Sequence, residues 1–351
     1  MFKSLFFSVI LSFFLLGAGT SARAADQEGG NKTDFIMHHI QDAHEWHFAT
    51  IGHTHISIPL PVIIFEVGHG LRFYMSSDFV DEHHQGIEHD GYYIDAHGHL
   101  KSTDESLTYY DISITKNVAS LFISVMLLFG VFVTIGRRYK QDPLAAPKGI
   151  QSFFEPIVIF IRDEIARPNI GEAKYERFMP YLLSVFFFIW FNNLLGLLPG
   201  AANLTGNISV TLTLALFTFV ITTFSGTKDY WKHIFNTPGV PWWLKFPLPL
   251  MPVVEFIGIL TKPFSLMVRL FANITAGHII IMSLIALVFI FESVYMGPVS
   301  VLFGLFMNLV ELLVAFIQAF VFTLLSAIYF GLAAEEHHHE EHKEKLGKAS
   351  A

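Results

Sequence analysis

Cysteine is absent from the 351 residues, and charged residues make up only 15% of them. The first absence excludes disulfides, thiolate catalysis and every zinc site built from cysteine. The second separates the chain from ordinary soluble proteins, in which about 25% of residues are charged. Lys and Arg number 22 against 30 Asp and Glu, which gives a formal net charge of -8. Phosphate binding needs a basic surface, so nucleic acid is excluded as a partner.

Apolar residues dominate the composition, with 52% hydrophobic residues, 37 Phe and a mean hydropathy of +0.49. This balance predicts an all-α polytopic membrane protein. Five apolar runs predict five membrane-spanning helices, at residues 118–135, 181–198, 208–224, 257–291 and 299–332. The last two exceed the ~20 residues that a perpendicular crossing needs, so we expect them to be strongly tilted.

Two further features of the apolar region carry predictions. Gly297 and Pro298 separate the last two runs and predict a turn, which makes these runs an antiparallel hairpin. The segment at residues 151–165 is too short and too charged to cross a membrane. Its mixture of Phe and Ile with Glu, Asp and Arg predicts an interfacial amphipathic helix.

The N-terminal residues resemble an export signal. Lys3 precedes a short apolar core, and small residues stand at Ala22 and Ala24. We therefore expect a signal peptide at residues 1–24 that is cleaved after Ala24. The alternative is an uncleaved first membrane helix, although the apolar core is shorter than the ~20 residues of a span. In either case residues 25–116, which are rich in His and in short alternating runs, predict a small β-containing domain in the periplasm.

The distribution of basic residues predicts the orientation. Eight follow the first span: Arg137, Arg138, Lys140, Lys148, Arg162, Arg167, Lys174 and Arg177. The connection at residues 199–207 has no Lys or Arg, whereas the next connection again contains lysines. This alternation predicts a multi-pass membrane domain at residues 117–333 in the bacterial inner membrane, with a cytoplasmic C-terminus. The acidic and His-rich residues 334–351 are then a solvated cytoplasmic tail.

Few polar residues interrupt the last two runs. They are Ser265, Arg269, Asn273, Thr275 and His278 in the first, and Asn308, Glu311, Gln318, Thr323 and Ser326 in the second. A charged residue at mid-bilayer costs roughly 2.5 to 3.5 kcal/mol even on insertion scales, and arginine cannot escape this cost by deprotonating. We therefore interpret Arg269 as part of a functional site. For Ser265, Thr275 and Asn308, holding helices together is an equally good interpretation, at about 0.6 kcal/mol per hydrogen bond.

The hairpin separates these residues into two layers. In an antiparallel pair the residue numbers at one depth have a nearly constant sum, so Gln318 is expected at the depth of Arg269, and Glu311 at that of His278. A His–Glu pair can take up and release protons and is a plausible relay. Arginine cannot relay a proton, but it can hold a nearby carboxyl in its ionised form. No carboxylate is expected at the depth of Arg269, so its partner must come from elsewhere.

At this point the residues resemble a known family. The stretches "EFIGILTKPFSLMVRLFANITAGHII" and "ELLVAFIQAFVFTLLSAIYF" are similar to the two signature helices of the a subunit of F-type ATP synthase, and the resemblance covers about residues 151–332. It implies a stationary subunit with two half-channels for protons beside a ring of c subunits. Arg269 would be the essential ring-facing arginine, with Asn273 and Gln318 as its polar neighbours. His278 and Glu311 would line the outer half-channel.

The resemblance also implies partners. They are the c-subunit ring, the peripheral stalk of b subunits, the rest of the ATP synthase and the lipid bilayer. No cofactor is expected, and no Gly-rich phosphate loop of the Walker type is present, so the chain would perform no bond chemistry by itself. In some bacterial members the residues that match His278 and Glu311 are exchanged, which suggests a shared role for the pair.

The sequence also allows other functions for the membrane region and several roles for the N-terminal domain. A proton-coupled secondary transporter would also explain intramembrane Arg, His and Glu, but it predicts repeated halves, and we find no such duplication. An intramembrane metalloenzyme that uses His278 and Glu311 lacks an H-E-x-x-H motif. The family pattern assigns nothing to residues 26–115. There, His53, His55, His83 and His84 could ligate a metal, or the domain could be a β-rich cap, a packing surface or a proton-collecting surface.

Overall fold

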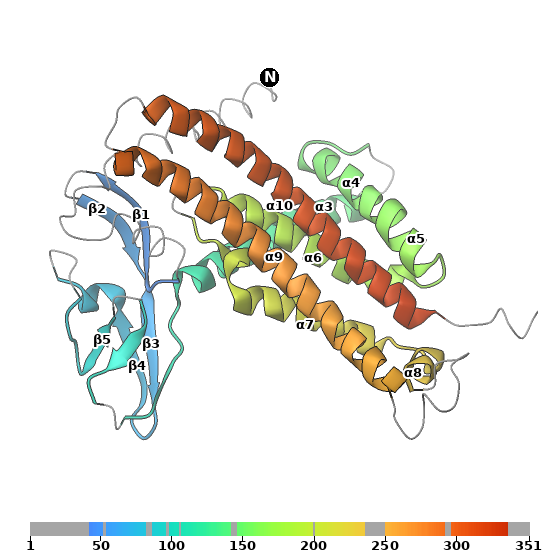
Figure 1. Cartoon of the computed structure of the whole chain (residues 1–351), viewed down its shortest axis with the longest axis horizontal. Helices are drawn as coiled ribbons and strands as arrows, with labels where there is room; N and C mark the ends of the chain where they lie inside the picture. Colours follow the sequence, from blue (N-terminus) through green and yellow to red (C-terminus); the bar gives the residue numbers. More distant parts are fainter. Residues whose placement is uncertain are drawn as a thin grey trace, which may run out of the picture. The chain divides into compact units, whose positions relative to one another are not determined.

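The computed structural model describes residues 42–51, 54–81, 86–95, 98–104, 107–141, 146–198, 201–235, 250–291 and 296–335 (Figure 1). The predicted signal peptide and nearly all of the predicted tail lie outside the described residues. The same holds for His53, His83 and His84 and for the side chain of His55.

The chain divides into two compact units, which are described separately. The first comprises Met1–Phe129, Phe191–Gly206 and Asn273–Ala315. The second comprises Gly130–Trp190, Asn207–Ala272 and Phe316–Ala351. Each of the two polar layers predicted for the hairpin has its principal pair inside one unit, since His278 and Glu311 lie in the first and Arg269 and Gln318 in the second.

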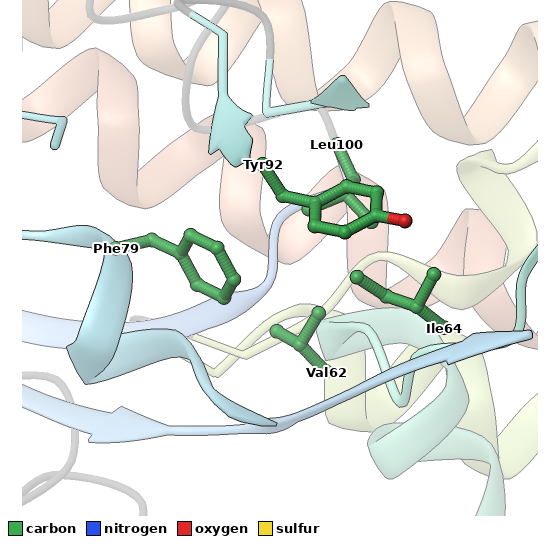
Figure 2. Close-up of a cluster of buried hydrophobic side chains, with 5 residues drawn as sticks. All are labelled: Val62, Ile64, Phe79, Tyr92 and Leu100. Carbon is green, nitrogen blue, oxygen red and sulfur yellow. The ribbon is translucent and has the colours of Figure 1, made fainter. Parts of the chain in front are cut away.

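The N-terminal part of the first unit is built from strands, as predicted. They are β1 (Glu45–Ile51), β2 (Thr54–Pro59), β3 (Pro61–Glu66), β4 (Gly70–Met75), β5 (Tyr92–Ile94), β6 (Leu100–Ser102) and β7 (Tyr109–Asp111), with the short 3-10 helix η2 (Ser76–Phe79) after β4. All pairings are antiparallel, in the orders β1-β2, β4-β3-β7 and β5-β6. Val62 and Ile64 alternate toward a core with Phe79, Tyr92 and Leu100, whose side chains point toward one another in Figure 2.

A polar clamp ties the start of this region to the first long helix. His44 is buried, with Nδ1 2.9 Å from the carbonyl oxygen of Gly98 and Nε2 3.3 Å from Oδ2 of Asp111. The carboxylate of Asp42 accepts from Thr115 Oγ1 at 2.8 Å and from the backbone N–H of Asn117 at 3.1 Å. This contact satisfies one of the backbone donors that a helix start leaves open.

The other described elements are helices. In order, the helices are α3 (Lys116–Gln141), α4 (Ile150–Phe160), the π-helix η3 (Ile161–Ala166), α5 (Arg167–Ile170), α6 (Tyr175–Gly196), the 3-10 helix η4 (Leu204–Gly206), α7 (Ile208–Phe224), α8 (Lys228–Phe235), α9 (Leu250–Phe291) and α10 (Met296–Ala334). Four of the five predicted spans fall within α3, α7, α9 and α10, and the span predicted at residues 181–198 ends two residues beyond α6.

Four of these helices, α3, α6, α9 and α10, are long and apolar enough to cross a membrane. The fold is therefore a mostly helical, multi-pass membrane architecture. α7 is apolar but shorter, at 17 residues, so a fifth crossing stays a prediction.

One boundary prediction was wrong. Gly297 and Pro298 do not form the turn between the long runs, because α10 begins at Met296 and includes both. The first turn of a helix tolerates Pro, since backbone donors there have no intrahelical partner. Residues 151–165, predicted as an interfacial amphipathic helix, are helical throughout, with α4 passing into the π-helix η3 at Ile161, and the interfacial position stays a prediction.

Aromatic and hydroxyl contacts hold the second unit together. The rings of Phe178 on α6 and Phe330 on α10 stack with centroids 4.9 Å apart. The Tyr181 hydroxyl lies 2.8 Å from Thr218 Oγ1 on α7, which in turn lies 3.4 Å from Ser326 Oγ on α10. These contacts join three helices around the part of α10 that carries Gln318.

Candidate functional site

A histidine and a glutamate meet between α9 and α10 in the first unit. His278 Nδ1 lies 3.2 Å from Glu311 Oε1, and the exposed fractions of the two side chains are 15% and 5%. In the same unit, Ser300 Oγ donates to the carbonyl oxygen of Leu284, so the two helices contact each other in opposite chain directions. The structure therefore brings together the two residues that the antiparallel numbering placed at one depth.

A glycine makes room for this pair. A Cβ atom added to Gly277 would lie 2.9 Å from Glu311 Oε1 and 3.2 Å from Glu311 Cδ. Separations below about 3.0 Å are not found for real Cβ atoms, so the carboxylate occupies space that only glycine leaves open. Gly277 thus lets the Glu311 carboxylate lie against α9 beside His278.

A buried asparagine supports α10 one turn beyond Glu311. Asn193 on α6 donates from Nδ2 to the carbonyl oxygen of Ala315 at 3.2 Å, and its Oδ1 accepts from Thr205 Oγ1 at 2.6 Å. Asn193 is 4% exposed, and Thr205 is fully buried. Because both of its polar atoms are engaged, the Asn193 side chain fixes α6 to α10 next to the pair.

The Glu311 carboxylate is incompletely satisfied. Among the residues that the structure describes, neither of its oxygens has a hydrogen-bond partner, so the 3.2 Å approach of His278 is a charge contact without hydrogen-bond geometry. Thr275 Oγ1, one turn before His278 on α9, is likewise buried without such a partner in the described chain. A buried polar group without a partner is costly, and such groups concentrate where a site does chemical work. Here the available chemistry is proton uptake and release.

The layer predicted around Arg269 is exposed on α9 and buried on α10. Arg269 and Asn273 are four residues apart on α9, and both are exposed on this chain. Leu266, Leu270 and Ile274 of the same helix are buried. Gln318, on α10, is 6% exposed. α9 therefore presents its cation and its asparagine on the surface, beside exposed apolar residues such as Val268, while Leu266, Leu270 and Ile274 face the interior.

Two further predicted polar residues, Ser265 and Asn308, have different surroundings. Ser265 is half-buried on α9. The Asn308 Nδ2 donates within α10 to the carbonyl oxygen of Gly304 at 2.9 Å. That contact stabilises one helix and brings Asn308 to no other residue of the site.

A second polar zone lies in the second unit. A small hollow there is lined by residues of α7, α8, α9 and α10, including Thr218, Thr222, Tyr230, Lys262 and Tyr329. The Lys262 ammonium lies 5.4 Å from the centre of the Tyr329 ring, within the range of a cation–π contact. Within the described ranges, no cluster of three or more His, Asp or Glu side chains has the arrangement of a metal site.

Comparison with known proteins decides the family. The sequence model described as "ATP synthase A chain" matches residues 118–331. The chain belongs to this family. It is similar to ATP synthase subunit a of Chloroherpeton thalassium, with 47% identity over 66% of this chain and 71% of the relative.

Two other relatives align across almost all of the chain. They are ATP synthase subunit a 2 of Chlorobaculum tepidum, 40% identical over 93% of this chain and 79% of the relative, and subunit a 2 of Prosthecochloris aestuarii, 41% identical over 90% and 85%. A second sequence model, described as a domain of unknown function, matches residues 35–121. The family thus accounts for the helical part, and the strand-rich part has its own recognised domain without an assigned role.

Sequence reasoning missed two residues of the site. Asn193 stands in the apolar stretch "IWFNNLLGLL", where an amide is as costly as in the last two runs. That signal was available. Gly277 gave a weaker signal, because a glycine inside a helix has several explanations and only the position of Glu311 shows which applies.

Proposed function

We propose that the chain is the proton-translocating subunit a of an F-type ATP synthase and that it provides two offset half-channels beside a ring of c subunits. The observation that carries the proposal is the pairing of a buried, incompletely satisfied His278–Glu311 contact with an exposed Arg269 on the same helix. A titratable buried pair suits proton transfer, and a permanent cation suits an electrostatic barrier.

The surface around Arg269 supports a partner helix that carries a carboxylate. Ala272 and Ala276 lie three and seven residues after Arg269 and are exposed, as is Asn273. Small side chains allow another helix to approach closely in a membrane. A carboxylate on that helix would be held in its ionised form by the guanidinium, which prevents its proton from passing directly between the half-channels.

The remaining roles follow from this arrangement. His278 and Glu311 exchange protons in the outer half-channel, with Thr275 beside them. Asn273 and the buried Gln318 are polar neighbours of the arginine. We further propose contacts with the peripheral b subunits, residence in the bacterial inner membrane after removal of residues 1–24, a periplasmic domain at 25–116, a membrane domain at 117–333 and a cytoplasmic tail at 334–351.

The first test replaces the arginine. Arg269→Ala should abolish proton-driven ATP synthesis in membrane vesicles, while ATP hydrolysis by the detached catalytic sector stays normal. Val268→Ala is the matched control, because Val268 is the neighbouring residue and is also exposed. Synthesis by Arg269→Ala at a rate near that of Val268→Ala would refute the proposed function.

A further inference from the structure

Strand β4 in the N-terminal domain has an inverted pattern of exposure. Leu71, Phe73 and Met75 are exposed, with exposed fractions of 56%, 68% and 41%. The residues between them, Arg72 and Tyr74, are turned to the other face and are half-buried. An antiparallel sheet with one solvent-exposed face normally turns polar residues toward the solvent and apolar residues toward the core. On β4 the outward residues are the apolar ones.

The neighbouring strands extend this pattern into a continuous surface. Phe73 pairs with Ile63 and Leu71 with Phe65 on β3, and Phe65 pairs in turn with Tyr110 on β7. Directly paired residues lie on the same face of a sheet, and so does a residue two positions along a strand. The apolar sheet face therefore consists of Ile63, Phe65, Leu71, Phe73, Met75, Tyr110 and Ile112. It contains no charged residue, and Tyr110 and Ile112 are 60% and 57% exposed.

The opposite face of the same sheet packs against the core of the domain. Val62 and Ile64 are buried against Phe79, Tyr92 and Leu100. The charged residues also lie on this face, where Arg72 Nη2 is 2.7 Å from Glu66 Oε2. The domain has thus turned the half-buried Arg72 and the buried Glu66 toward its core and left aromatic and aliphatic side chains outside. Large exposed apolar patches mark surfaces that meet another apolar phase.

The chain itself ties this face to a membrane span. After β7, the backbone N–H of Ile112 donates to Ile63 at 2.9 Å and that of Ile114 donates to Pro61 at 3.0 Å, so the chain stays bonded along β3 almost to α3. Three residues separate Ile112 from Lys116, the first residue of α3, and the four steps from one to the other can extend over at most about 14 Å. The face therefore lies close to the point where α3 begins.

The first turns of α3 continue the same apolar character. Phe122, Met126 and Phe129 are 57%, 73% and 71% exposed, as expected for a helix surrounded by lipid. In Figure 1, β5 lies on the side of β3 and β4 away from the start of α3. Because β5 carries Tyr92 of the core, the apolar sheet face is turned to the side from which α3 departs.

We propose that the apolar sheet face rests on the lipid bilayer, in the headgroup region of the leaflet at which α3 begins. Tyr favours this boundary, because its ring meets acyl chains while its hydroxyl meets water, and Phe adds apolar area that inserts among the acyl chains. The absence of charge on the face fits a hydrophobic contact rather than attraction to anionic headgroups, and the short connection from Ile112 to α3, whose exposed residues at 122–129 are apolar, favours lipid over a separate protein partner. The domain would thus be held at the surface by both its sheet and its helix.

The test uses the lack of native cysteine in the chain. A nitroxide label is attached to Phe73→Cys in the full-length chain, which is reconstituted in phosphatidylcholine vesicles. Spin relaxation by oxygen, which concentrates in lipid, is compared with relaxation by a water-soluble nickel complex. The matched control is Tyr93→Cys on β5, a residue that is 37% exposed and lies outside the apolar sheet face. We expect oxygen to dominate at position 73 and nickel at position 93.

Two results would overturn the proposal. Equal dominance of nickel at both positions would place the face in water. Protection of position 73 from both relaxers would place it against protein, including a second copy of the chain. Tyr110→Cys on β7 repeats the measurement from another strand of the same face, so a local folding defect at one position cannot decide the outcome.

Discussion

Two histidine–carboxylate contacts in the first unit have almost the same length and opposite surroundings. His44 and Asp111 lie 3.3 Å apart in the strand-rich domain, and His278 and Glu311 lie 3.2 Å apart between α9 and α10. The second ring nitrogen of His44 meets the Gly98 carbonyl oxygen, and Asp111 also accepts from the backbone N–H of Ser113 at 2.9 Å. By contrast, neither Glu311 oxygen has a hydrogen-bond partner within the described part of the chain.

The difference is one between a fully satisfied contact and an incompletely satisfied one. Burial alone would lower the pKa of His44, but the hydrogen bond and charge of Asp111 outweigh it and raise that pKa above 6.5. Burial would likewise raise the pKa of Asp111, yet the hydrogen bonds from His44 and Ser113 lower it below 3.8. The groups of the His44–Asp111 pair are satisfied, whereas the Glu311 carboxylate keeps acceptor positions open, which in the proposed function would receive a proton in transit.

Among the changes that test this comparison, exchanging the members of the membrane pair should have the largest effect. His278→Glu and Glu311→His each leave two like groups at one depth, and we expect proton-driven synthesis to fall by about tenfold or more, equivalent to roughly 1.4 kcal/mol in the barrier. The double exchange restores one imidazole and one carboxyl and should recover part of the rate. Proton uptake by reconstituted vesicles is the measurement. A double variant no better than the worse single variant would show that the two residues act separately.

The space for the carboxylate gives the next prediction. Gly277→Ala puts a methyl group where the Glu311 carboxylate now lies, so the carboxylate must move away from His278. Coupled synthesis should fall several-fold with little loss of assembled complex. Gly304→Ala on α10 is the control, because a Cβ there meets nothing within 4 Å in the structure. Equal rates for the two alanine variants would mean that the contact with Gly277 does not position Glu311.

The sequence predicted one of these residue contacts but could not predict the others. The meeting of His278 with Glu311 followed from antiparallel numbering alone, because helix rise is constant and the apolar runs fixed the direction of each helix. The bonds of Asn193 to Thr205 and Ala315 could not be foreseen, since they join segments whose relative depth no periodicity fixes. The contact of His44 with Asp111 could not be predicted from the sequence, for another reason. Twelve histidines in one polar region give no means to choose which one a loop will bury.

The support of α10 provides a prediction about stability. Asn193→Leu leaves the Thr205 hydroxyl and the Ala315 carbonyl oxygen without their partner in a buried place, which should cost about 1–3 kcal/mol. The measurement is the thermal denaturation of the purified complex. Asn273→Ala is the comparison, because Asn273 is exposed: it should leave the denaturation temperature unchanged and still reduce coupling. If both variants denature alike, Asn193 has no special structural role.

The smallest effect is expected at His44, and it should depend on pH. Because the folded-state pKa of His44 is raised above 6.5, its stabilisation is complete below pH 6.5 and is lost as the pH rises through that raised value. Because the pKa of Asp111 is lowered below 3.8, its contribution is present above pH 3.8 and is lost as the pH falls through the lowered value.

His44→Gln should therefore loosen the domain most between these limits, while ATP synthesis is retained. Hydrogen exchange of the backbone amides of Ile112 to Asn117, measured across this range, reports the clamp. His69→Gln is the control, since His69 is an exposed histidine whose only ion-pair contact in the described chain is with Glu66. A difference between His44→Gln and the native chain that stays constant with pH would show that the clamp acts through packing and not through the charge of the pair.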